Sequence, residues 1–88
     1  MKIKQGFTLK KIAGSWVVLP LAEKTLDFTG ILTLNDSGRM LWQLLLDGCT
    51  RTELADALVN EFDVDYNEAL ADVDEYLQTL ARTGCLDD

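Results

Sequence analysis

The sequence predicts a single α+β domain, residues 1–88, in which three strands precede three helices. Two observations support this prediction. Before residue 35, short runs of β-branched and aromatic residues are separated by turn residues, whereas after it apolar residues recur at helical spacing. The order βββααα, with a three-stranded antiparallel sheet packed on three helices, is a winged helix-turn-helix-like architecture.

Three strands are expected in the first part of the chain. Phe7–Ile12 and Trp16–Leu21 flank the turn residues of a hairpin, and Pro20 should lie at a strand end or a bulge because it cannot donate a ladder hydrogen bond. The third strand, Asp27–Leu34, alternates between two faces. Its predicted core face carries Phe28, Gly30, Leu32 and Leu34, and its other face carries Thr29, Ile31 and Thr33.

Each predicted helix begins at a capping residue. Asn35 or Asp36 can cap the first helix, Thr50 and Glu53 match a capping box, and Asp65 can cap the third. Gly48 and Gly84 are expected to end the first and last helices, and Cys85 and Leu86 to fold back on the core. The expected apolar faces are Met40, Leu41, Trp42, Leu44 and Leu45; Leu54, Ala55, Leu58, Val59 and Phe62; and Tyr66, Ala69, Leu70, Val73, Leu77 and Leu80.

Composition argues against catalysis. The chain has no His, no glycine-rich phosphate loop and no CxxC, so we predict no catalytic residue, no metal ligand and no cofactor. Cys49 and Cys85 are interpreted as small apolar residues, although one disulfide between them is conceivable. There is no secretory signal and no apolar run of about 20 residues, so we expect a cytoplasmic protein that does not enter membranes.

Charge is distributed unevenly along the chain. Residues 1–34 carry five Lys against Glu23 and Asp27, a net charge of +3, whereas residues 35–88 carry three Arg against thirteen acids, a net charge of −10. Such a division could orient a partner, or it could simply be the solvated surface.

The segments LTLNDSGRMLWQLLLDG, TRTELADALVNEFDVD and ADVDEYLQTLARTGCL resemble the PqqD-like family, whose members are also described as RiPP recognition elements. The resemblance covers nearly the whole chain, and Cys85 departs from it where an aliphatic residue is more usual. The residues that carry it are Leu34-Asn35, Gly38, Trp42, Leu45, Asp47-Gly48, Thr50, Glu53, Leu54, Leu58, Phe62-Asp63-Val64, Asp72-Val73, Leu77, Leu80 and Gly84.

This resemblance implies a peptide-binding function without chemistry of its own. Family members bind the leader segment of a ribosomally made precursor peptide and present it to a modifying enzyme, often a radical-SAM protein, a leader peptidase or a cyclase. The leader adds as a strand to the third strand and lies beside the third helix. Carried over to this chain, the peptide-binding residues are Phe28, Thr29, Gly30, Ile31, Leu32, Thr33, Asp72, Val73, Tyr76, Thr79 and Leu80.

The residues themselves are compatible with this implication. The segment 28–34 has no charge and no Pro, the devices that usually protect a free edge, although an uncovered edge can also have no role. Tyr76 is expected to offer its ring to apolar leader side chains while its hydroxyl stays in water, or else to be a rim aromatic. Asp72 can equally be a solvated helix acid. Val73 and Leu80 are expected in the core, as is Trp42.

Three alternatives remain open at this stage. Lys10, Lys11 and Lys24 are either solvated or meet an acidic leader or the partner enzyme. A winged-helix nucleic-acid-binding regulator would have this shape, but its recognition helix would carry four acids, Glu68, Asp72, Asp74 and Glu75, against Arg82 alone. The third alternative is a scaffold or dimerisation domain without peptide binding. A free edge strand could also pair with a second copy of the chain in a homodimer.

Overall fold

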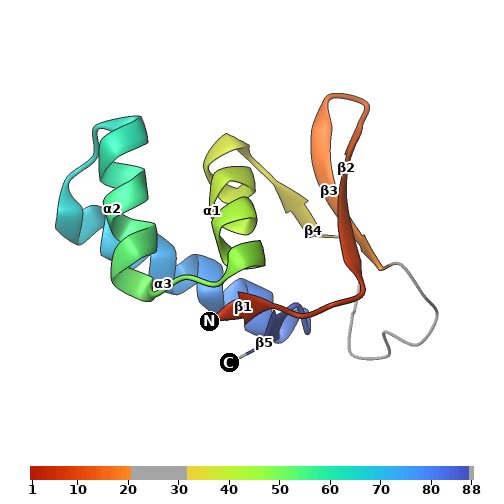
Figure 1. Cartoon of the computed structure of the whole chain (residues 1–88). Coiled ribbons are helices and arrows are strands. Elements are labelled where there is room, and N and C mark those ends of the chain that lie inside the picture. Colours follow the sequence, from red (N-terminus) through yellow and green to blue (C-terminus); the bar gives the residue numbers. More distant parts are fainter. Residues whose placement is uncertain (21–31, 88) are drawn as a thin grey trace.

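The computed structural model describes residues 1–20 and 32–87, and its strands and helices follow the predicted order, with one further short strand near each end (Figure 1). The α+β class, a three-stranded antiparallel sheet followed by three helices, is confirmed. None of the helices in the described ranges is long and apolar enough to cross a membrane. The elements are β1 (Lys2–Ile3), β2 (Phe7–Ile12), β3 (Ser15–Pro20), β4 (Leu32–Leu34), α1 (Asp36–Asp47), α2 (Arg51–Phe62), α3 (Tyr66–Arg82) and β5 (Leu86–Asp87).

The three-stranded sheet has the order β2-β3-β4, with β3 in the centre. Ile12 pairs with Ser15 across a two-residue turn, in which Ala13 (φ 50°) and Gly14 (φ 84°) both have positive φ. Such a turn matches the right-handed twist of the strands it joins, and Ala13 adopts a conformation that normally favours Gly or Asn. Pro20 is the last residue of β3, as its missing N–H predicts.

The predicted third strand corresponds to β4. Its described residues alternate as expected, with Leu32 and Leu34 buried and Thr33 exposed. The predicted strand residues 27–31, and Leu21 at the end of the second predicted strand, lie outside the described residues.

All three predicted helix caps are present. The Asn35 side chain caps α1, the reciprocal capping box of Thr50 and Glu53 starts α2, and Asp65 accepts a hydrogen bond from the Asn67 N–H at the start of α3. Gly48 caps the C-terminus of α1 with a φ of 97°, a conformation that favours glycine.

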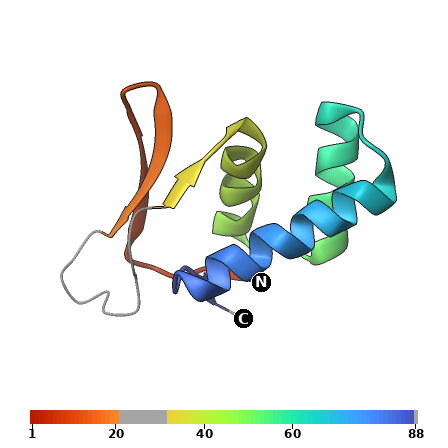
Figure 2. The same ribbon diagram turned by 180° about the vertical axis from the view of Figure 1, so that it is seen from behind.

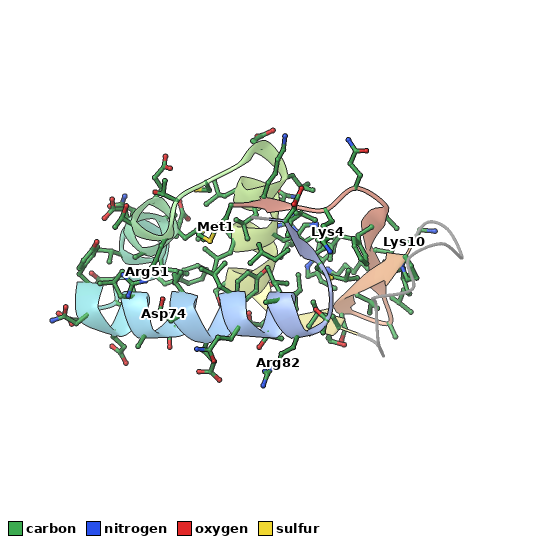
Figure 3. All side chains as sticks on the ribbon, turned by 90° about the horizontal axis from the view of Figure 1, so that it is seen from below. Met1, Lys4, Lys10, Arg51, Asp74 and Arg82 are labelled. Carbon is green, nitrogen blue, oxygen red and sulfur yellow. The ribbon has the colours of Figure 1, made fainter. Side chains whose placement is uncertain are left out.

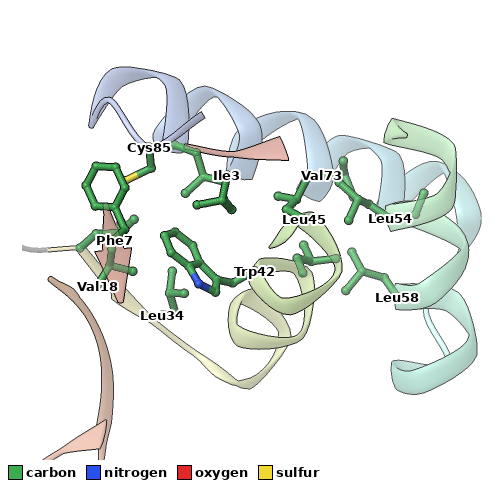
Figure 4. Close-up of a cluster of buried hydrophobic side chains, with 14 of the residues drawn as sticks. Ile3, Phe7, Val18, Leu34, Trp42, Leu45, Leu54, Leu58, Val73 and Cys85 are labelled. Carbon is green, nitrogen blue, oxygen red and sulfur yellow. The ribbon is translucent and has the colours of Figure 1, made fainter. Parts of the chain in front are cut away.

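The core lies between the sheet, α1 and the two other helices (Figure 4). Trp42 is 1% exposed and lies among residues of the sheet and of the C-terminal segment, including Phe7, Leu34 and Cys85. Cys85 is completely buried, so the expected return of the chain onto the core is confirmed. Both cysteines are free, and the conceivable disulfide is not formed.

Two predicted core residues are exposed. Phe62 is 44% exposed and Tyr66 is 40% exposed. Phe62 is the last residue of α2 and Tyr66 the first of α3, so both lie at the α2–α3 link, at the margin of the packed layer. Helical periodicity identified their face of the helix, but it does not show where along the helix burial stops.

The sequence did not predict β1 and β5, which pair antiparallel as Lys2 with Asp87 and Ile3 with Leu86. The Lys4 N–H also donates to the Cys85 carbonyl at 2.8 Å, and the Cys49 N–H donates to the Met1 carbonyl at 2.9 Å. These bonds bring both ends of the described chain together beside α1 and α3, as Figure 1 shows.

Candidate functional site

A groove of about 1160 Å³ separates β4 and the start of α1 from α3. Figure 2 shows α3 running past α1 toward the C-terminal strand. The groove's apolar lining residues come from five elements and the α2–α3 link: Trp16, Leu32, Leu34, Leu41, Leu58, Phe62, Val64 and Leu80. A groove lined in this way can take an extended chain with apolar side chains.

One wall of the groove is an edge strand. β4 pairs with β3 through Val18–Leu32, Val17–Thr33 and Trp16–Leu34, and in the described residues no strand pairs with its other edge. Successive residues of a strand direct their backbone N–H and C=O groups alternately to the two sides. The outer edge of β4 therefore carries backbone groups that an added strand can bond.

The join between β4 and α1 fixes this end of the groove. Asn35 Oδ1 accepts hydrogen bonds from the Gly38 N–H at 2.8 Å and from the Ser37 hydroxyl at 3.0 Å. One side chain thus ends the strand and starts the helix. This cap explains why so short a link is sufficient, and it holds β4 against the helical layer.

Tyr76 connects α3 to the start of α1. Its hydroxyl donates a hydrogen bond to the Gly38 carbonyl at 2.7 Å, and burial raises the pKa of the Tyr76 phenol above its usual value. The expectation that this hydroxyl stays in water is therefore wrong, although the ring does line the groove. Gly38 leaves room for the ring, because a Cβ there would lie 3.3 Å from Tyr76 Cε1 and 3.2 Å from Asn35 Oδ1.

The exposed wall of α3 is polar. Asp72, Glu75, Tyr76 and Thr79 follow one another at helical spacing and all line the groove. The Thr79 hydroxyl donates to the Glu75 carbonyl at 3.1 Å and accepts from Arg82 Nη2 at 3.3 Å.

Asp74, on a neighbouring face of α3, has a different environment. Arg51 Nη2 of α2 donates to Asp74 Oδ2 at 2.8 Å, and Figure 3 shows the pair between the two helices. The hydrogen bond from Arg51 lowers the pKa of the Asp74 carboxyl. Asp74 thus joins α2 to α3 outside the groove lining.

The predicted site residues divide into three groups. Those that line the groove are Leu32, Thr33, Asp72, Tyr76, Thr79 and Leu80. Val73 is completely buried and belongs to the core, and Leu80 is completely buried beneath the groove, as their apolar stripe predicted. Phe28, Thr29, Gly30 and Ile31 lie outside the described residues. Which of these residues contact a ligand stays a prediction.

Sequence reasoning missed part of the lining. Trp16 lies at the hairpin end of the groove, where the Lys11 ammonium is 5.6 Å and the Arg39 guanidinium 4.4 Å from its ring centroid. Phe62 was assigned to the core but lies in the groove wall. The Lys-Trp-Arg stack joins three separate elements, and no local pattern could have revealed it.

The described ranges hold no group of three or more His, Cys, Asp or Glu residues arranged to bind a metal ion. The groove therefore offers backbone edges, apolar side chains and carboxylates. These are the components of a binding site.

Comparison with known proteins assigns the chain to a family. The family model for coenzyme PQQ synthesis protein D (PqqD) matches residues 15–86. The chain belongs to the PqqD family. The match takes in the central and last strands of the sheet, all three helices and therefore both walls of the groove in this PqqD-family protein.

Two solved structures resemble nearly the whole PqqD-family chain. A lasso peptide synthetase B1 complexed with the leader peptide has a TM-score of 0.74 at 21% identity, with 96% of this chain and 93% of that one covered. TbiB1 in complex with the TbiA(beta) leader peptide has a TM-score of 0.71 at 28% identity, with 92% and 88% covered. A comparison with curated proteins finds no match.

Proposed function

We propose that this PqqD-family protein binds the leader segment of a ribosomally synthesised precursor peptide by strand addition to β4. The peptide's side chains then enter the groove between β4 and α3. The observation that carries the proposal is the position of a strand edge, with which no other described strand pairs, along a groove of about 1160 Å³. Main-chain hydrogen bonds supply affinity in this mode of recognition, and pockets for alternate side chains supply specificity.

Its relatives support the same occupant. Both similar structures hold a leader peptide, and TbiB1 shares 28% of its residues with this chain. The protein would work in the cytoplasm, where it would present the precursor to a separate modifying enzyme such as a radical-SAM maturase, a peptidase or a cyclase. By tethering the precursor it would raise the substrate concentration near that enzyme without catalysing a reaction itself.

The test is an NMR titration of isotope-labelled protein with leader peptides encoded by small open reading frames beside its gene. We expect shifts concentrated in Leu32–Leu34 and along the groove face of α3, from Asp72 to Leu80. Shifts confined to β2, the opposite edge of the sheet, would contradict the proposal. So would an unchanged spectrum with every neighbouring peptide.

A backbone-modified peptide makes the test specific for strand addition. N-methylation removes one amide donor, and in an added strand only alternate amides face β4. Methylation of an amide that faces β4 should abolish binding, and methylation of the next amide along the peptide should leave binding nearly unchanged. An equal loss of affinity on methylation of either of two adjacent amides would contradict strand addition. If β4 instead pairs with a second copy of the chain, the protein will be dimeric and the leader will compete with dimerisation.

A further inference from the structure

The charged residues that line the groove are all acidic. Among the described residues these are Asp36, Asp72 and Glu75. Asp36 is in the first turn of α1, where the helix dipole favours a carboxylate, so its position has a local reason. Asp72 and Glu75 lie in the interior of α3, where the helix dipole does not explain the presence of a carboxylate.

These two acids also lack a side-chain partner among the residues that the structure describes. No hydrogen bond or ion pair joins the side chain of either residue to another described residue, whereas Asp74 beside them is bound by Arg51. They are three residues apart on one helix face, where like charges destabilise a helix slightly. Asp is, moreover, a weak helix former. The fold thus keeps two unfavourable charges in the groove wall, and a cationic ligand would relieve their repulsion.

Three described cations lie at or beside the groove, and each has another contact. Lys11 and Arg39 stack on the Trp16 ring at the hairpin end, and Arg82 reaches Thr79 from beyond the groove lining. Among the described residues, cations thus approach the groove beside Trp16 and at Thr79, and none of them bonds Asp72 or Glu75.

The surrounding lining is suited to long basic side chains. Phe62 and Val64 line the same groove as the acidic residues, and both apolar residues are at least partly exposed. The aliphatic part of Lys or Arg can lie on such surface while the charge reaches a carboxylate. An acidic side chain in the same place would be repelled.

We propose that the groove selects leader segments with Lys or Arg at the strand positions that face α3, paired with Asp72 and Glu75. This inference rests on the proposed function and specifies the substrate class of the same site. In this complex the basic side chains belong to the peptide and the acidic ones to the groove. The alternative that the hairpin lysines bind an acidic leader is not part of this proposal.

The test is selection of bound peptides from a displayed library of random 12-residue segments, with the whole protein as bait. We expect enrichment of Lys and Arg in peptides that shift β4 resonances. The variant Asp72→Lys/Glu75→Lys should bind the selected peptides roughly three- to tenfold more weakly, as two exposed ion pairs are replaced by repulsion. Added salt should weaken binding to the wild type more than to this variant.

A matched control distinguishes the effect of charge in the groove from the effect of net charge on the whole protein. Asp56→Lys/Glu61→Lys makes the same change in charge on the exposed surface of α2, away from the groove lining, and should retain binding of the selected peptides. Circular dichroism would check that both variants are folded.

The outcomes distinguish this inference from the proposed function. Peptides that shift β4 without enrichment of basic residues, or that bind the Asp72→Lys/Glu75→Lys variant equally well, would overturn the inference and leave strand addition standing. A library that yields no peptide bound at β4 would overturn the inference and count against the proposed function as well.

Discussion

At the scale of single residues, the contact between Tyr76 and Gly38 sets the spacing between α3 and the start of α1. Tyr76→Phe removes a buried hydroxyl donor and leaves the Gly38 carbonyl without it. We expect the free energy of unfolding to fall by about 1 kcal/mol. Urea denaturation measures this change, and Tyr66→Phe, at a tyrosine that is 40% exposed and donates no hydrogen bond to a described residue, is the matched control. An equal loss in both variants would contradict a structural role for the Tyr76 hydroxyl.

Tyr76 also marks the limit of prediction for a single residue. Its place on α3 follows from helical spacing, so its position beside the groove was foreseeable. Its partner is a backbone carbonyl 38 residues away, and no local pattern encodes that contact. The same holds for Trp16, whose neighbours Lys11 and Arg39 come from β2 and α1. Local chemistry predicts which face a residue occupies, whereas its exact partners depend on how the elements pack.

At the scale of elements, α2 is held at its start by the capping box. The Thr50 N–H donates to Glu53 Oε1 at 2.9 Å, and this hydrogen bond lowers the pKa of the Glu53 carboxyl. A lowered pKa in the folded state stabilises the protein above the unfolded pKa, and this stabilisation is lost as the pH falls. We therefore expect Glu53→Gln to destabilise the protein near pH 7 and to have progressively less effect below about pH 4. Glu61→Gln removes the same charge at an exposed site of α2 and is the control; an identical pH profile for both variants would contradict the capping argument.

The helix caps were predictable because each is completed within a few residues. Asn35, Thr50 with Glu53, and Asp65 all bond backbone groups two or three positions away. The pairing of β1 with β5 is the opposite case. Lys2 and Asp87 are at opposite ends of the sequence, and a two-residue strand has no alternation to detect.

At the scale of the whole molecule, the distribution of charge bears on which partner the fold can accept. In a winged-helix nucleic-acid binder, the helix at the position of α3 would meet phosphates. Here Glu68, Asp72 and Glu75 are exposed along α3, and they would repel a phosphate backbone. Two of these acids, Asp72 and Glu75, line the groove and are the ones that we propose to pair with a basic peptide.

The pairing of β1 with β5 joins the two ends of the described chain. Ile3 of β1 is 6% exposed and belongs to the same buried cluster as Trp42 and Cys85. If that cluster folds as one unit, Ile3→Ala should lower the free energy of unfolding by about 2–4 kcal/mol, although Ile3 is only the third residue of the described chain. Ile12→Ala is the matched control, because Ile12 is also a strand residue but is 49% exposed, and it should cost less than about 1 kcal/mol.

Tryptophan fluorescence and far-UV circular dichroism, followed in the same urea titration, test this cooperativity. The fluorescence comes from Trp42 in the core and from Trp16 beside the groove, and circular dichroism reports chiefly on the helices. Coincident transitions that shift together in Ile3→Ala would mean that the terminal strands and the helical layer unfold together. Separate transitions, or an Ile3→Ala loss as small as that of Ile12→Ala, would mean that the β1–β5 pair opens independently. The position of α3, and with it the width of the groove, would then not depend on the closure of the two ends.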